Sequence, residues 1–185
     1  MQHYLILDRD EVLNEMPAGM KYLKSPNDVV LKKENILGLQ NLQPLKLKIL
    51  VASNQRGIGL GLVTKEEVDA VNQEINRQLN KFNLQVEKFF YCPHKNLDNC
   101  NCRKPRPGML HEASNDFGFQ LEDSIFGGDM TSDCYAGIRS GCKTILLNTH
   151  QPDPELSESK SFLGVFPSLL SASETIKEFY LNINC

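Results

Sequence analysis

Short apolar runs alternate with amphipathic segments along this chain of 185 residues, and this alternation constrains the fold more than any other feature. Each run is too short for a typical helix, and all but one end at a polar or glycine residue, so each is interpreted as a buried strand. The runs comprise residues 4–7, 47–52, 86–91, 124–127 and 144–147. The segments between them predict helices over residues 31–43, 64–82, 109–117 and 132–139. Strands that alternate with helices predict an α/β fold with a doubly wound parallel sheet.

Proline and glycine mark the segments that we expect to lack regular structure. They indicate a loop over residues 15–28, a second loop at residues 57–61 and a surface loop over residues 151–160. Near the C-terminus, a serine followed three residues later by a glutamate predicts a closing helix over residues 171–181.

The composition is that of an ordinary globular protein, with 41% hydrophobic and 23% charged residues. We expect one domain over residues 1–185, in which residues 151–185 form a C-terminal loop and helix. A net charge of −3 gives no indication of a nucleic-acid or membrane partner. No apolar stretch reaches the ~18 residues that a membrane span requires, and we expect no signal peptide before the first strand. We expect a cytoplasmic protein, and we expect a monomer.

Polar side chains follow three of the predicted strands. Asp8 and Asp10 follow the first strand, Ser53 follows the second, and Asp129 follows the fourth. Ligands of open α/β folds bind beyond the carboxyl ends of the strands, so we expect these side chains to converge there. Lys104 lies just after a cysteine-rich segment and completes the set.

These residue types meet the needs of phosphoryl transfer. A carboxylate can attack phosphorus, and a second carboxylic acid can protonate the leaving oxygen. A magnesium ion held by acids offsets the repulsion between the nucleophile and the phosphate. A hydroxyl and an ammonium group bind the oxygens on which charge accumulates. The sequence therefore predicts a magnesium-dependent site that acts on a small phosphorylated molecule.

A second cluster combines three of the six cysteines with a histidine, within residues 92–102. Its members are Cys92, His94, Cys100 and Cys102. Three thiolates and one imidazole fill a tetrahedral zinc shell and leave no position for a substrate water, so we expect a structural zinc. The acidic chain and the ligand spacing both disfavour a nucleic-acid-binding finger.

The chain resembles the haloacid dehalogenase superfamily phosphatases in its four motifs, which are Asp8-Arg9-Asp10, Ser53-Asn54, Lys104, and Gly128-Asp129 with Asp133. The run from Cys92 to Pro105 is similar to the zinc-bearing subgroup that contains heptose-bisphosphate and histidinol-phosphate phosphatases. The likeness covers about residues 4–148. It implies a Rossmann-like fold without a large cap domain, in which small loops such as the zinc loop shape the pocket.

The resemblance implies a role for each motif residue. Asp8 would be the nucleophile, and Asp10 the general acid and later the base. Magnesium would bind the carboxylates of Asp8 and Asp129 and the backbone carbonyl of Asp10. Ser53 and Lys104 would hold the phosphoryl group. The residues implied to line the substrate are Asn54, Gln55, Arg56 and Arg103.

The substrate implied by the resemblance is D-glycero-D-manno-heptose 1,7-bisphosphate, which would lose its 7-phosphate on the route to nucleotide-activated heptose. The run of residues 106–110 is similar to the heptose-bisphosphate branch, and Arg56 and Arg103 suit a second phosphate. The spacing before Cys100 is instead similar to the histidinol-phosphate branch. Histidinol phosphate carries a cationic amine, for which Glu11 and Glu15 are candidate partners.

One position departs from the family pattern. The family usually has glycine directly after its second aspartate, and this chain has Glu11. Glycine at such a position serves an unusual backbone conformation or a close approach to the site. A glutamate there adds a side chain and a negative charge, so the alternative hypothesis is a catalytically impaired protein that only binds a phosphosugar.

Overall fold

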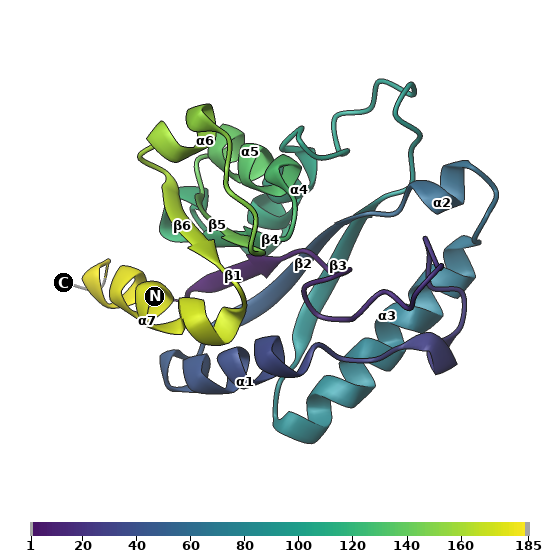
Figure 1. Cartoon of the computed structure of the whole chain (residues 1–185), viewed down its shortest axis with the longest axis horizontal. Helices are drawn as coiled ribbons and strands as arrows, with labels where there is room; N and C mark the ends of the chain where they lie inside the picture. The colour runs from purple at the N-terminus through teal and green to yellow at the C-terminus, as the bar shows by residue number, and fades with distance from the viewer. Residues whose placement is uncertain (1, 184–185) are drawn as a thin grey trace.

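The computed structural model describes residues 2–183, and its centre is a six-stranded parallel sheet (Figure 1). The strand order is β3-β2-β1-β4-β5-β6. The strands are β1 (Tyr4–Leu7), β2 (Lys48–Asn54), β3 (Val86–Cys92), β4 (Ile125–Gly128), β5 (Lys143–Leu147) and β6 (Phe162–Phe166). Leu5 of β1 is in register with Ile49 of β2 on one side and Ile125 of β4 on the other. Because every pair is parallel, the carboxyl ends of all strands face the same edge.

Helices cover both faces of the sheet, as the doubly wound pattern predicts (Figure 1). The helices are α1 (Lys33–Leu42), α2 (Arg56–Gly59), α3 (Lys65–Leu79), α4 (Gly108–Phe117), α5 (Thr131–Ser140), α6 (Pro154–Glu158) and α7 (Leu169–Asn182). Helices α1, α3 and α7 lie on one face, and α4 and α5 lie on the other. Short 3-10 turns occur at Pro26–Asp28, Gln43–Leu45, Asn80–Phe82 and Leu121–Asp123.

Strand β1 separates two cores because its side chains alternate between the faces. Leu5 and Leu7 pack on the side of α1, α3 and α7, whereas Tyr4 and Ile6 pack on the side of α4. All four side chains are buried. The run that reads as uniformly apolar in the sequence is therefore a strand covered on both faces, which is typical of parallel sheets.

Helix α3 shows how local sequence defines an element. Thr64 accepts a hydrogen bond from the Glu67 backbone, and the Glu67 side chain accepts one from the Thr64 backbone, which together form a capping box. The apolar stripe is buried from Val68 to Leu79. Phe82 lies beyond the helix in a 3-10 turn and is 40% exposed, so it does not continue the stripe.

The C-terminal part of the fold differs from the sequence prediction. Residues 151–160 include helix α6, and β6 adds a sixth strand that the pattern did not predict. Strand β6 lies at the sheet edge, its residues are only half-buried, and Gly164 interrupts the run at a φ of 137°. Helix α7 begins at Leu169, earlier than predicted, because Ser168 rather than a later serine caps it.

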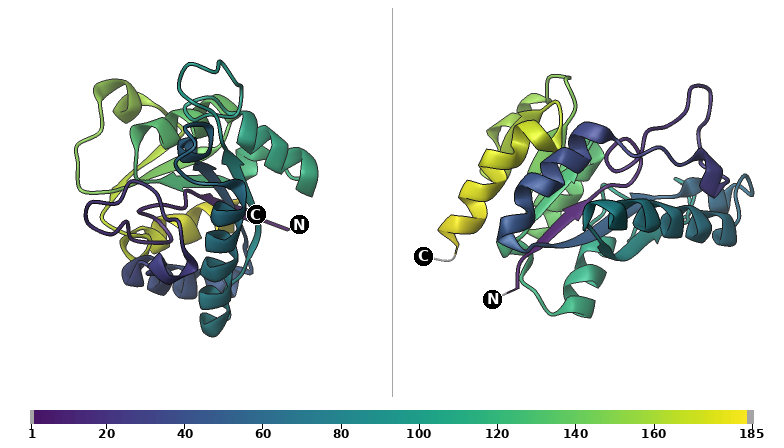
Figure 2. Two further views of the ribbon diagram at one scale, coloured as in Figure 1. Left: turned by 90° about the vertical axis from the view of Figure 1, so that its right-hand side faces the viewer. Right: turned by 90° about the horizontal axis from the view of Figure 1, so that it is seen from below.

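Two glycine-related features also bear on packing. The predicted loop at residues 57–61 contains the short helix α2, and of its glycines Gly61 adopts a positive φ of 68°. Helices α1 and α7 lie side by side (Figure 2). They approach closely at Gly38, where a Cβ atom would lie 2.4 Å from the backbone of Leu169.

Within the described residues, no helix combines the length and apolarity that crossing a membrane requires.

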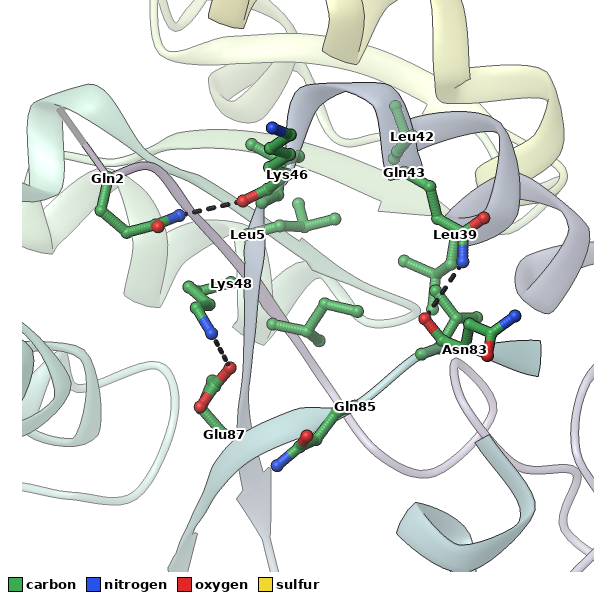
Figure 3. A pocket seen from close by; sticks show the side chains of 13 residues that line it. Gln2, Leu5, Leu39, Leu42, Gln43, Lys46, Lys48, Asn83, Gln85 and Glu87 are labelled. Atoms are coloured by element: carbon green, nitrogen blue, oxygen red, sulfur yellow. Dashed lines mark hydrogen bonds and ion pairs between the residues drawn. The ribbon is translucent and has the colours of Figure 1, made fainter. Parts of the chain in front are cut away.

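A hollow of about 350 Å³ lies near the amino ends of β2 and β3 (Figure 3). Apolar side chains, among them Leu39 and Leu42, line one part of it. Polar groups around it are already paired, since Gln2 donates to the Lys46 carbonyl and Lys48 contacts Glu87 at 2.6 Å. The predicted catalytic side chains lie at the opposite ends of the strands, so this hollow is separate from them.

Candidate active site

Lys104 connects strands β1 and β2 with helix α5 at the carboxyl edge of the sheet. Its Nζ atom lies 2.9 Å from Asp8 Oδ1 and donates to the carbonyl of Ala52 at 2.8 Å. It also lies 2.7 Å from Asp133 Oδ1. Lys104 is 4% exposed and Asp8 is 8% exposed, so these charges meet in a buried environment. Charged groups that are removed from water need partners of opposite charge, and here each has one.

Three carboxylates lie close together beside Lys104, two of them after strands and one in a helix. Asp8 follows β1, Asp129 follows β4, and Asp133 lies in the first turn of α5. Carboxylate oxygens of the three lie within 4.8 Å of one another, which suits a hard divalent cation. Gly128 permits this approach, because a Cβ atom there would lie 2.2 Å from Asp133 Oδ2. The residues thus fit a magnesium ion between β1 and β4.

Burial and mutual repulsion raise the pKa values of two of these acids. Burial raises the pKa of Asp8 to about 6, against the charge of Lys104, and the charges of Asp133 and Asp10 add to the rise. Burial and the charge of Asp8 raise the pKa of Asp129 to about 7. Burial lowers the pKa of Lys104, but the charges of Asp133 and Asp8 outweigh it and raise this pKa above its ordinary value. A bound divalent cation would relieve the repulsion between the acids.

Asp10 is held by side chains from neighbouring segments. Arg9 donates to both of its carboxylate oxygens, from Nε at 3.0 Å and from Nη2 at 3.1 Å. Asn14 donates to Oδ1 at 3.1 Å, and Gln55 donates to Oδ2 at 2.9 Å. The Asp10 side chain is 26% exposed, so it still reaches the open side of the site.

Ser53, at the end of β2, is 3% exposed and accepts a hydrogen bond from Gln55 Nε2 at 2.9 Å. Gln55 was expected to line the substrate, but its amide is buried and joins Ser53 to Asp10. Asn54 was also expected to contact the substrate. It lines a cleft beside Lys104, and its side chain accepts from the Lys104 backbone N–H at 3.0 Å and donates to the Lys104 carbonyl at 3.2 Å. The Gln55 side chain therefore holds Ser53 and Asp10, and the Asn54 side chain holds the backbone of Lys104.

The two arginines expected to meet substrate lie in different surroundings. Arg56 begins helix α2, and its Nε donates to the Tyr22 hydroxyl at 3.4 Å. Arg103 lines a cleft of about 460 Å³ beside Lys104. Its Nη1 atom is buried and has no hydrogen-bond partner within residues 2–183. A buried donor without a partner is costly, so Arg103 is suited to receive an acceptor from a ligand.

The cysteine and histidine cluster has the geometry of a zinc site. Cys92 Sγ lies 3.6 Å from both His94 Nδ1 and Cys100 Sγ, and His94 Nδ1 lies 3.2 Å from Cys102 Sγ. A tetrahedral zinc with Zn–S bonds of about 2.3 Å separates its ligand atoms by roughly 3.3 to 3.8 Å. The five described cysteines are free thiols. The donor set and the spacing both fit zinc.

Sequence reasoning did not assign roles to four residues that complete the site. Asp133 was recognised in a motif but given no function, and Arg9 lies between the two aspartates of the first motif. Asn148 follows β5, where its position at a strand end was the available signal, and its Nδ2 donates to the Asp129 carbonyl at 2.7 Å. Asn72 on α3 accepts from Arg9 Nη1 at 3.0 Å, and nothing in its local sequence indicates this contact.

The parallel sheet, with these acids near the carboxyl ends of its strands and a lysine beside them, has the site arrangement of the haloacid dehalogenase superfamily phosphatases. A family model described as polynucleotide kinase 3 phosphatase matches residues 4–151. The chain therefore belongs to the haloacid dehalogenase superfamily of phosphatases.

Curated relatives and solved structures agree with this assignment. The D-glycero-alpha-D-manno-heptose-1,7-bisphosphate 7-phosphatase of Photorhabdus laumondii is 30% identical over 171 residues, which cover 86% of this chain and 92% of that protein. The D-glycero-beta-D-manno-heptose-1,7-bisphosphate 7-phosphatase of Neisseria meningitidis is 29% identical and covers 94% of each chain. The crystal structure of D,D-heptose 1,7-bisphosphate phosphatase from B. bronchiseptica, complexed with magnesium and phosphate, superposes with a TM-score of 0.82. It is 26% identical and covers 96% of this chain and 99% of that one.

Proposed function

We propose that this phosphatase hydrolyses the 7-phosphate of D-glycero-D-manno-heptose 1,7-bisphosphate through a phospho-aspartyl intermediate on Asp8. The observation that carries the mechanism is the buried contact of Lys104 with Asp8, at 2.9 Å, next to Asp129. This arrangement supports a mechanism in which a nucleophile, a phosphate-binding cation and metal ligands act on one phosphoryl group.

In the first proposed step, a carboxylate oxygen of Asp8 attacks phosphorus as the bond from phosphorus to the sugar oxygen breaks. Asp10 gives its proton to that leaving oxygen, so the sugar departs as an alcohol. Lys104 and the hydroxyl of Ser53 bind the non-bridging oxygens of the transferring group. Both are buried at the carboxyl edge of the sheet, where their electrostatic effect is greater than in water.

In the second proposed step, a water molecule attacks the phosphorus of the acyl phosphate. Asp10, now a carboxylate, takes the proton of the water as the Asp8–phosphorus bond breaks, which restores both residues and releases phosphate. The carboxylates of Asp8 and Asp129 and the backbone carbonyl of Asp10 would hold magnesium, which would neutralise charge between the nucleophile and the phosphate.

The cleft beside Lys104 supports a substrate with a second phosphate. It is lined by four further cationic side chains, and none of its described lining residues is an acid. The four are Lys95, Arg103, Arg106 and Arg139. Arg106 and Arg139 also donate to backbone carbonyls of the chain, whereas Arg103 Nη1 is buried and unpaired within residues 2–183. A distal phosphate would provide acceptors for Arg103.

Two observations favour this substrate over the alternatives. Histidinol phosphate needs an acidic partner for its amine, but the Glu11 carboxylate already contacts Lys32 at 2.9 Å and the Met16 backbone at 3.0 Å. A polynucleotide substrate, which the description of the family model suggests, fits poorly with a chain of net charge −3. The pairing of Glu11 also disfavours a catalytically impaired binding protein, because its charge is neutralised.

A substrate panel tests this proposal. We expect kcat/KM with magnesium to be highest for heptose 1,7-bisphosphate, and at least roughly tenfold lower for fructose 1,6-bisphosphate, histidinol phosphate and a 3′-phosphorylated oligonucleotide. Arg103→Met should raise KM for the bisphosphate much more than for 4-nitrophenyl phosphate, which has no second phosphate. A preference for histidinol phosphate or the oligonucleotide would overturn the substrate assignment.

A further inference from the structure

Arg9 is a charged side chain in the interior, and the phosphatase reaction described above gives it no part. It is 1% exposed, although it lies between the two aspartates of the catalytic motif. Burial of a guanidinium group is unfavourable unless it is paired and hydrogen-bonded. Arg9 meets that requirement through Asp10 and Asn72, so its position is tied to the carboxylate that we propose as the general acid.

The contact between Arg9 and Asp10 is a fork. Two guanidinium nitrogens donate to two carboxylate oxygens, at 3.0 and 3.1 Å, which fixes the plane of the carboxylate as well as its distance. A lysine provides a point charge and cannot reproduce this geometry. Orientation matters here because a proton transfer depends on the direction in which the carboxyl group points.

Asn72 anchors the other side of the guanidinium. It lies in helix α3, is 6% exposed, and accepts from Arg9 Nη1 at 3.0 Å. Gln55, just after β2, also donates to the Asp10 carboxylate. The carboxylate is therefore held from two parts of the chain that are distant in sequence, by Gln55 directly and by Asn72 through Arg9. Helix α3 packs into the core through Val71 and Ile75 on either side of Asn72, which gives the anchor a rigid base.

We infer that Arg9, anchored by Asn72, is a positioning residue that orients Asp10 for proton transfer to the leaving oxygen. This inference rests on the proposed phosphatase mechanism. It implies that losing the fork slows reactions whose leaving group needs a proton. Reactions whose leaving group departs as a stable anion should depend on it much less.

The test compares two esters with each variant. The alkyl ester is whichever sugar phosphate of the substrate panel is hydrolysed fastest, and the aryl ester is 4-nitrophenyl phosphate. The measured quantity is kcat/KM, which reports the steps up to departure of the leaving group and therefore excludes hydrolysis of the phosphoenzyme. The variants are Arg9→Lys, which keeps the charge, and Asn72→Ala, which keeps both Arg9 and Asp10. Ile75→Val, a core change in the same helix, is the control.

For Arg9→Lys we expect kcat/KM to fall on the order of 10- to 100-fold with the alkyl ester, within the range of general acid catalysis. The fall with 4-nitrophenyl phosphate should be under about threefold. Asn72→Ala should show the same discrimination at a smaller size, and Ile75→Val should show none. Because Asn72→Ala removes no charge, it keeps the test decisive if Arg9→Lys does not fold.

Equal losses on both esters, or no loss on either, with an active wild-type protein would overturn the positioning role and leave the phosphatase mechanism standing. A wild-type protein that hydrolyses neither ester with magnesium would instead overturn the proposed function, and the positioning role with it.

Discussion

Glu11 adopts a backbone conformation that glycine adopts easily, and it adds a charged side chain at that position. Its φ of 60° lies in the left-handed region, which explains why the family usually has glycine there. The conformation costs a non-glycine residue roughly 1–2 kcal/mol. Lys32 offsets part of this cost, because its ammonium group contacts both the carboxylate and the backbone carbonyl of Glu11.

We therefore expect Glu11→Gly to change kcat/KM by less than about threefold. Relief of the backbone strain and loss of a half-exposed ion pair oppose each other, so the free energy of unfolding should change by only about 1 kcal/mol. Steady-state kinetics and urea unfolding measure both quantities. A wild-type protein that is silent and gains turnover on this change would support the binding-protein hypothesis instead.

The raised pKa values of Asp8 and Asp129 predict how magnesium binding depends on pH. Both lie above the unfolded value, at about 6 and about 7, so between about pH 4 and pH 7 the folded protein holds more protons than the unfolded chain. Without metal, these two groups make the protein less stable as pH rises through that window. Magnesium needs both carboxylates ionised, so its stabilising effect should grow with pH.

Thermal unfolding with and without saturating magnesium measures this effect. The increase in Tm should be larger at about pH 8 than at about pH 5, and Asp129→Asn should remove most of it at both values. Equal increases at the two pH values would show that these carboxylates do not hold the metal.

At the scale of elements, the zinc loop joins β3 to the segment that carries Lys104. It has no helix or strand between Cys92 and Gly108, so local backbone hydrogen bonds provide little support. Gly108 packs against it closely, since a Cβ atom there would lie 2.4 Å from the Asn101 carbonyl oxygen. The metal cluster would therefore fix the position of Lys104 as well as the loop.

Metal analysis of protein purified without chelator should find about one zinc per chain. Cys100→Ala should lose the zinc, lower Tm and reduce activity, because the Lys104 segment loses its support. Cys134→Ala is the matched control, since this buried thiol lies outside the cluster, and it should keep the zinc. Disulfides among Cys92, Cys100 and Cys102 would contradict the assignment.

The elements that the sequence predicted well are those with strong local signals. Strands β1 to β5 are short apolar runs, and α3 carries its own capping box and a buried stripe. Strand β6 could not be predicted, because an edge strand has half-buried residues and its pairing with β5 is a tertiary contact. The same limit applies to the site, where the strand-end acids were recognisable but the Arg9–Asn72 contact joins residues 63 positions apart.

At the scale of the whole molecule, the strand order brings the chemistry together. Strand β1 lies between β2 and β4, so Asp8, Ser53 and Asp129 are neighbours although they span more than half of the chain. Lys104 enters this edge from the zinc loop and contacts Asp8 and Asp133. The parallel sheet thus determines which side chains meet, and the loops after each strand supply them.

The most direct test of the central claim is the turnover of a phosphate ester by Asp8→Asn in the presence of magnesium. Uncatalysed hydrolysis of phosphate monoesters is so slow that enzymes reach up to ~10²¹-fold acceleration, so loss of the nucleophile should leave no measurable rate. Asp116→Asn, a surface change that removes an ion pair with Lys88, should keep full activity. An Asp8→Asn protein that turns over 4-nitrophenyl phosphate at the wild-type rate would contradict the phospho-aspartyl mechanism.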